Sequence, residues 1–291
     1  MNVINGFLVY RIIEEHIKNK APLSLIRLGD GEGAVLGFPN FTSLTNVERI
    51  GRIWFGDSRL KKEDFISLSE QIKTAVKSAD IIGVPRQRQV EKDPLYGAVH
   101  QSLTKFELIS ETAVLTDAAV HRYLQFALLY RPLLQNRSFV GMISSRDLRA
   151  QLTQIFNIES IKLYQIRGEH RFPGTIEIDH YPDQFEWLKN NVSVPYPGAI
   201  FLVGAGALGK IYCDIIKQRG GIAIDVGAIF DAWAGVKSRL KHPCHSLQRY
   251  EEIPQITVER AILRYNGLIR AFKLDTPLAE RQDMAGNMDV W

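Results

Sequence analysis

The chain contains only two cysteines in 291 residues, Cys213 and Cys244, which excludes a disulfide framework and a cysteine-based zinc site. It also lacks an apolar run of about 18 residues, the length that a helix needs to cross a bilayer. The first five residues show no basic stretch followed by an apolar one, which argues against a secretory signal. We therefore expect a soluble cytoplasmic protein, and peripheral contact with the inner face of a membrane is compatible with the sequence.

A large excess of one charge is missing as well. The 36 basic and 32 acidic residues leave a net charge of +4, and the basic residues are spread along the chain. This distribution does not indicate nucleic-acid binding. It suits an anionic substrate or an anionic membrane surface. The absence of a Gly-x-Ser-x-Gly sequence argues against an α/β-hydrolase.

Short apolar segments alternate with amphipathic helical patterns from the beginning of the chain to about residue 235. This alternation predicts an α/β fold that is Rossmann-like, with a mainly parallel sheet and helices on both faces. The strands are expected at 23–28, 80–85, 112–116, 138–143, 161–166, 199–203 and 222–226. Residues 1–235 are expected to form one domain. Residues 236–291 are expected to form a partly irregular arm that packs on it, with a weak helix over 257–272.

The first predicted strand runs into two carboxylates, Asp30 and Glu32, that alternate with glycines. In an extended segment residues two apart point to the same side, so both side chains could direct oxygen atoms at one point. Mg²⁺ or Mn²⁺ bound with a phosphate-bearing substrate needs only one or two protein carboxylates. Gly29 and Gly31 would let the backbone approach a ligand, and Arg27 could neutralise a phosphate or pair with a carboxylate. An ordinary solvated turn is the alternative.

A second glycine-rich segment, Gly204–Gly209, matches Gly-x-Gly-x-x-Gly between a predicted strand and a predicted helix. The free N–H groups of such a helix start accept phosphate, so we interpret Gly204, Gly206 and Lys210 as phosphate contacts. Asp225 could contact a ribose or order the loop. The position argues against a nicotinamide cofactor, because only one predicted strand follows a fingerprint that normally opens its fold. A purely structural tight turn is the other interpretation.

Two further polar residues are candidates for a general base. His180 lies in a polar segment before a predicted helix, and Asp147 follows the predicted strand 138–143. A hydrogen-bonded structural role is the alternative for His180. Because ligands of an open α/β sheet bind beyond the carboxyl ends of its strands, we expect these groups and the glycine-rich segments to converge there.

The segment from Arg27 to Glu32 resembles the Arg-x-Gly-Asp-Gly-Glu sequence of the bacterial GT-D-fold glycosyltransferases. Similar segments of that family are found at 144–148, 180–183, 204–210 and 225–235, and the resemblance covers roughly residues 20–235. It implies a single Rossmann-like domain in which an Asp-x-Glu motif, here Asp30-Gly31-Glu32, holds Mn²⁺ or Mg²⁺ together with a UDP-sugar. The resemblance does not identify which residue acts as the catalytic base.

The leading hypothesis is a metal-dependent hexosyltransferase. It would move a sugar from a UDP-sugar to a hydroxyl of an acceptor glycan, lipid-linked acceptors included, in the synthesis of a surface polysaccharide or glycoconjugate. One alternative is an NAD(P)-dependent oxidoreductase that uses Gly204–Gly209 and Asp225, and another is a non-catalytic nucleotide- or glycan-binding module. None of these involves nucleic acid. The sequence does not choose the donor sugar, the acceptor, the stereochemical course or the oligomeric state.

Overall fold

The computed structural model describes residues 4–56, 60–238 and 246–253, together with residues 257, 260, 261 and 263. Within these residues one sheet is formed by β1 (Leu23–Arg27), β2 (Ile81–Val84), β3 (Val114–Asp117), β4 (Val140–Ser144), β5 (Ile161–Gln165), β6 (Ile200–Val203) and β7 (Ile222–Asp225). The strand order is β3-β2-β1-β7-β6-β4-β5. Every neighbouring pair is parallel, which confirms the predicted sheet.

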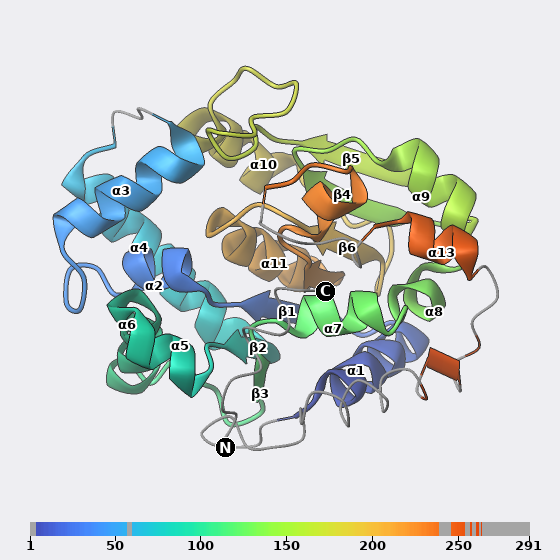
Figure 1. The fold of residues 1–291 in the computed structure, drawn as a ribbon, viewed down its shortest axis with the longest axis horizontal. Coiled ribbons are helices and arrows are strands. Elements are labelled where there is room, and N and C mark those ends of the chain that lie inside the picture. Colours follow the sequence, from blue (N-terminus) through green and yellow to red (C-terminus); the bar gives the residue numbers. More distant parts are fainter. Residues whose placement is uncertain are drawn as a thin grey trace.

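Helices connect the strands and cover both faces of the sheet (Figure 1). Those that precede β4 are α1 (Gly6–Asn19), α2 (Asp30–Leu36), α3 (Leu44–Phe55), α4 (Lys62–Ser78), α5 (Gln87–Lys92), α6 (Pro94–Lys105), α7 (Val120–Phe126) and α8 (Tyr130–Leu134). Those that follow are α9 (Arg149–Phe156), the π-helical turn η1 (His180–Gln184), α10 (Phe185–Asn191), α11 (Leu208–Gln218), α12 (Ile229–Trp233) and α13 (Gln248–Glu252).

Two apolar cores lie between the sheet and its helices. Leu25 of β1 belongs to one core together with Val9 of α1. The next residue, Ile26, belongs to the other core together with Ile72 of α4 and Ile216 of α11. Successive residues of a strand point to opposite faces, so a sheet covered on both faces needs apolar side chains at every position. This requirement explains why the strands could be recognised as continuous apolar runs.

The order of the strands places a crevice between β1 and β7. From β1 the chain moves outward through β2 to β3, and it then crosses the sheet to β4 and β5. It returns through β6 to β7, which pairs with β1. β1 and β7 are therefore neighbours at the point where the half of the sheet built outward from β1 meets the half that ends at β7. In open α/β sheets such a switch point, at the carboxyl ends of the strands, is where ligands bind.

Two segments without an expected helix form helices. Residues 86–97 form a polar stretch of the sequence between two predicted strands, and they contain α5 and the start of α6. Asp93 caps α6 by accepting a hydrogen bond from Leu95 N–H at 2.9 Å, and Pro94 occupies the first helical position. This pair is a strong local signal for a helix start. The mixed segment 38–60, expected to cover the site, contains α3.

Residues 246–253 pack against the core that contains Val9 and Leu25. Tyr250 of α13 is buried, its hydroxyl donates to Oε1 of Gln125 at 2.9 Å, and its ring meets that of Phe156 edge-on. The proposed boundary between residues 235 and 236 stays a prediction, and most of the expected helix over 257–272 lies outside the described residues. No helix in the described part of the chain is long and apolar enough to span a membrane.

Candidate functional site

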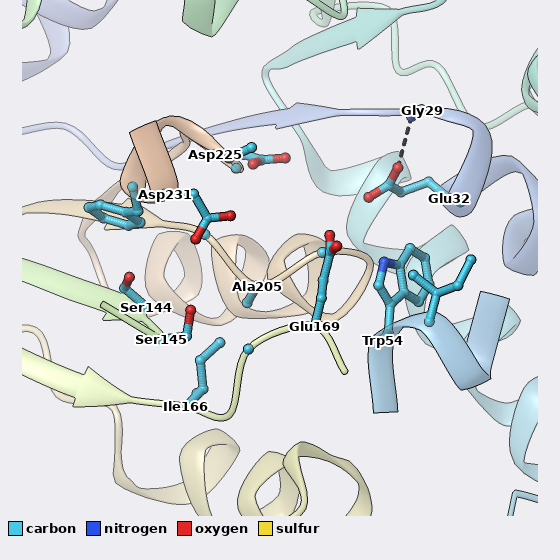
Figure 2. Close-up of a pocket in the computed structure, with 18 of the residues that line it drawn as sticks. Gly29, Glu32, Trp54, Ser144, Ser145, Ile166, Glu169, Ala205, Asp225 and Asp231 are labelled. Carbon is cyan, nitrogen blue, oxygen red and sulfur yellow. Dashed lines mark hydrogen bonds between the residues drawn. The ribbon is translucent and has the colours of Figure 1, made fainter. Parts of the chain in front are cut away.

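A cavity of about 390 Å³ opens beyond the carboxyl ends of the strands, at the switch point between β1 and β7 (Figure 2). Several segments far apart in the sequence line it, including residues 29–32, 144–146, 166–169 and 204–206. Of the predicted site residues, the cavity lining includes Arg27, Gly29, Asp30, Gly31, Glu32, His180, Gly204, Gly206, Lys210 and Asp225. These groups therefore lie around one cavity, which does not include Asp147, and the roles predicted for them stay predictions.

The acidic motif has a different conformation from the one predicted. Asp30 and Glu32 lie in the first turn of helix α2, whose N-cap is Gly29, rather than in an extended segment. Residues two apart in a helix point about 200° apart, so the two side chains do not share one side. Glu32 accepts a hydrogen bond from Gly29 N–H at 2.9 Å, which is the acidic half of a capping box. The carboxylate of Glu32 therefore helps to start the helix.

The carboxylate of Asp30 is not neutralised by a basic side chain. Within the described residues it has no ion-pair partner, whereas Glu32 pairs with Lys210. Burial and the nearby charge of Glu32 raise the pKa of Asp30. Burial and the same two carboxylates also help to raise the pKa of Tyr96 to about 12. This corner of the cavity thus carries uncompensated negative charge.

Lys210 of α11 joins the two sides of the switch point. Its buried ammonium group donates to Glu32 Oε1 at 2.6 Å, to Asp225 Oδ2 at 2.9 Å and to the Gly206 carbonyl at 3.0 Å. Burial opposes its charge, but Asp225 and Glu32 outweigh burial and raise the pKa of Lys210. The predicted phosphate contact therefore has all three of its donors engaged by the protein.

Asp225 at the end of β7 is held by a second cation, Arg27. Nη2 of Arg27 lies 3.1 Å from Asp225 Oδ1, and its Nε donates to the Asp225 carbonyl at 3.0 Å. Burial opposes ionisation of Asp225, but Arg27 and Lys210 outweigh it and lower the pKa of this carboxyl. Arg27 also lies beside His121, whose Nδ1 is 2.9 Å from its Nη1. Arg27 thus pairs with a carboxylate, one of the two roles predicted for it.

The second glycine-rich segment forms a tight turn into α11, beside the acidic corner. Gly206 has φ of +54°, a conformation that favours glycine. A Cβ at Gly204 would lie 2.5 Å from Cδ2 of Phe230, so this glycine is required by packing. Gly204–Gly206 face the cavity and precede the N-terminus of an eleven-residue helix, where partial positive charge favours an anion.

Trp54 at the end of α3 forms a further wall that the sequence did not reveal. Its indole lies between the two glycine turns, because a Cβ at Gly31 would be 2.4 Å from its Cζ2 and one at Gly206 would be 3.4 Å from its Nε1. Figure 2 shows the half-buried indole at the edge of the cavity beside Glu32. A planar aromatic surface at this position is suited to stacking against a flat ring.

Asp231 lies on the side of the cavity away from Trp54 (Figure 2), and it pairs there with Arg146, which also lines the cavity. Nε of Arg146 lies 2.7 Å from Asp231 Oδ1, and its Nη2 donates to the Phe172 carbonyl at 2.9 Å. The sequence placed Asp231 after the last strand but did not identify it as a site residue. No local signal in the sequence marks its pairing with Arg146, which lies 85 residues away in the chain.

The two residues predicted as candidates for a general base have unfavourable positions. His180 lines the cavity, but it is buried, and its Nε2 lies 3.0 Å from the Tyr212 hydroxyl. Burial lowers the pKa of His180 to about 3, which makes it a weak base. Asp147 does not line this cavity. It is exposed on the β4–α9 connection and pairs with its neighbour Arg149 at 2.6 Å.

The fold and the cavity define a doubly wound α/β protein with a cavity at its switch point. A model of the GT-D fold-like domain matches residues 5–233, and the chain belongs to this family. A glycosyltransferase from Streptococcus sanguinis is 13% identical, with 90% of this chain and 96% of that chain covered at a TM-score of 0.51. A second structure, described as domain of unknown function 1792 with a distinct glycosyltransferase fold, is 12% identical, with 89% and 92% covered at a TM-score of 0.50.

Identities this low establish a shared fold and nothing further about chemistry. The family match and these structures confirm the predicted family and fold. A search of curated proteins gave no match.

Proposed function

We propose that this protein is a metal-dependent glycosyltransferase that takes a sugar from a UDP-sugar and transfers it to a hydroxyl of an acceptor glycan. The observation that carries the proposal is the position of Asp30. Its unpaired carboxylate lies at the switch point, in the same cavity as Glu32 and the glycine turn that starts α11. Membership of the GT-D fold-like family supports the same reaction class.

The donor atoms fit a hard divalent cation such as Mn²⁺ or Mg²⁺. Asp30 offers oxygen atoms that no basic side chain of the described residues occupies. Each oxygen of Glu32 accepts one hydrogen bond, from Lys210 or from Gly29, and a carboxylate oxygen has a second lone pair. No group of three or more metal-binding side chains exists in the described part of the chain. The remaining ligands would therefore be diphosphate and water oxygens, as is usual for these ions.

The charge of the cavity also favours a cation that accompanies the substrate. Among the described residues, five basic and five acidic side chains line the cavity, so its formal charge is zero when the histidines are neutral. The basic residues are Arg27, Arg122, Arg146, Arg167 and Lys210, and the acidic residues are Asp30, Glu32, Glu169, Asp225 and Asp231. A diphosphate would bring further negative charge into this site. When bound, a divalent cation supplies the positive charge that stabilises a departing nucleoside diphosphate.

The chain itself would position the donor. The glycine turn before α11 would accept the diphosphate, and the indole of Trp54 would stack against the uracil ring. Lys210 and Arg27 would hold Glu32 and Asp225 in fixed orientations during the reaction. The sugar would then extend toward Arg146 and the far side of the cavity.

The structure offers less support for a nicotinamide cofactor. A dinucleotide fingerprint requires an acidic residue that is free to bind the ribose. Asp225, which has the right spacing in the sequence, is buried and paired with both Arg27 and Lys210. A non-catalytic binding module would share the cavity but would release no UDP from a donor.

A combined binding and turnover screen tests the proposal. Thermal unfolding would be followed with UDP, UDP-hexoses and NAD(P)H, each with and without Mn²⁺, and UDP release would be measured for the same donors. We expect Mn²⁺ to be required for stabilisation by UDP and for UDP release from at least one UDP-hexose. Stabilisation by NAD(P)H without metal would contradict the proposal. UDP binding without release from any donor would indicate the non-catalytic module instead.

A further inference from the structure

We propose that Asp231 is the catalytic base that removes the proton from the acceptor hydroxyl, so that transfer proceeds by a single displacement with inversion at the anomeric carbon. This inference rests on the proposed glycosyltransferase function. It assigns a role to a residue that is distinct from the acidic motif and lies at the opposite side of the cavity (Figure 2).

The geometry of Asp231 is that of an oriented base with one oxygen available. Arg146 contacts Oδ1 at 2.7 Å, whereas no hydrogen bond to Oδ2 is formed within the described residues. Figure 2 shows the carboxylate directed into the cavity, between Asp225 and the pair Ser144 and Ser145. The side chain is 19% exposed, which leaves access for a hydroxyl group. A base held by a third group is the usual arrangement for proton transfer.

The surroundings keep this carboxylate in place. Arg146 is anchored by its Nη2 to the Phe172 carbonyl at 2.9 Å and by its backbone N–H to Ser144 Oγ at 2.9 Å. Helix α12, which carries Asp231, is fixed by the buried side chains of Phe230 and Trp233. Precise orientation of a base by rigid neighbours is what effective catalysis requires.

The other carboxylates that line the cavity are committed elsewhere. Glu32 and Asp225 share the ammonium group of Lys210, and Asp225 is also bound by Arg27. Asp30 lies in the acidic corner beside Glu32, where the diphosphate is proposed to bind. Glu169 is carried by the loop between β5 and η1, outside regular secondary structure. Among the described residues that line the cavity, Asp231 is therefore the carboxylate that combines a rigid support with an accessible oxygen.

The reaction that follows is balanced in atoms and charge. The acceptor oxygen forms a bond to the anomeric carbon while the bond from that carbon to the β-phosphate oxygen breaks. The electron pair of the broken bond leaves with UDP, and the acceptor proton goes to Asp231 Oδ2. Attack from the face opposite the leaving group inverts the anomeric configuration. With water in place of the acceptor, the same base would support slow hydrolysis of the donor.

Donor hydrolysis provides a test that needs no identified acceptor. UDP release from UDP-glucose, UDP-galactose and UDP-N-acetylglucosamine would be measured with Mn²⁺ for the wild type, Asp231→Asn and Asp231→Ala. We expect both variants to lose about 10²- to 10⁴-fold in UDP release, the usual contribution of a general base. UDP affinity should stay within threefold of the wild type. Glu159→Gln, an exposed carboxylate before β5, is the control and should hydrolyse the donor as the wild type does.

Azide separates a base from a structural role, because this anion attacks carbon without losing a proton. With sodium azide, Asp231→Ala should regain UDP release and form a glycosyl azide of inverted configuration. Unchanged hydrolysis in Asp231→Asn, a product of retained configuration, or loss in Asp231→Ala that azide does not restore would each overturn the assignment. Loss of hydrolysis in Glu169→Gln but not in Asp231→Asn would transfer the role to Glu169. Wild-type protein that releases no UDP from any donor would instead contradict the proposed function itself.

Discussion

Replacing Lys210 by methionine should destabilise the fold strongly, because this residue is the shared cation of a buried network. Methionine keeps most of the apolar stem but removes an ammonium group within 2.6 Å of Glu32 and 2.9 Å of Asp225. Breaking a buried ion pair typically costs about 3–5 kcal/mol, since the remaining charge stays buried. Here Asp225 keeps Arg27 and Glu32 keeps the Gly29 N–H, so we expect the lower end, about 3 kcal/mol.

Urea unfolding at pH 7 measures this loss. With a denaturant slope of about 3 kcal/mol/M, the midpoint should fall by about 1 M. Lys217→Met is a matched control on the same helix, because Lys217 lies 2.8 Å from Asp80 but its side chain is 21% exposed. A partly exposed pair of this kind is screened by water and contributes far less than a buried one, about 1 kcal/mol. Adding Glu32→Gln to Lys210→Met removes one buried charge, so the double variant should be more stable than the sum of the single effects by about 1–2 kcal/mol. Additive effects, or a loss for Lys210→Met no larger than the control's, would refute the network.

Two further predictions concern His180 and Gly227. The neutral form of His180 is favoured in the fold, with a pKa of about 3 against an ordinary 6.5, so its contribution is complete above pH 6.5 and is lost as pH falls toward 3. Between pH 6.5 and 5 the wild type should lose about 2 kcal/mol more unfolding free energy than His180→Gln, measured in urea, and equal losses would contradict the burial of this ring. Gly227→Ala should cost about 1–3 kcal/mol, because Gly227 has φ of +50° and a Cβ there would lie 2.1 Å from Nη2 of Arg27. Gly97→Ala, whose Cβ would meet only Val90 at 3.9 Å, should be neutral or stabilising, and equal effects of the two substitutions would refute the steric explanation.

The strands could be predicted because the sheet imposes a local pattern. Each strand is covered on both faces, so it reads as an uninterrupted apolar run between polar loops. Their parallel arrangement follows from alternation with helices. The helix at 87–92 was missed because none of its residues is buried, so no apolar periodicity marks it. The helix at 94–105 does carry Leu95, Val99 and Leu103 at helical spacing. The capping pair Asp93-Pro94 could have revealed the second of them.

The site was predictable in position but not in its interactions. Glycine-rich and acidic segments at strand ends predicted convergence, and parallel strands bring their carboxyl ends together. The partners of Lys210 could not be found this way, because Glu32 is 178 residues away in the chain. The predicted extended conformation of the acidic motif was wrong, because Gly29 is the N-cap of helix α2 and the side chain of Glu32 accepts a hydrogen bond from the Gly29 N–H. Asp147 lies outside the cavity, where it pairs with Arg149 two residues away, and the sequence pattern did not distinguish this local pairing from a position in the site.

The central claim is that Asp30 holds a divalent cation for a UDP-sugar, and one measurement tests it most directly. UDP release from the UDP-hexose that the wild type uses best would be titrated with Mn²⁺ in the wild type, Asp30→Asn and Glu91→Gln. Asp30→Asn is more informative than a change at Glu32, which also caps α2, and Glu91 is an exposed carboxylate on α5 outside the cavity. We predict a saturable Mn²⁺ dependence in the wild type and Glu91→Gln, and loss of Mn²⁺-dependent release in a folded Asp30→Asn variant. Release by Asp30→Asn at the wild-type rate and with the same Mn²⁺ dependence would contradict the claim.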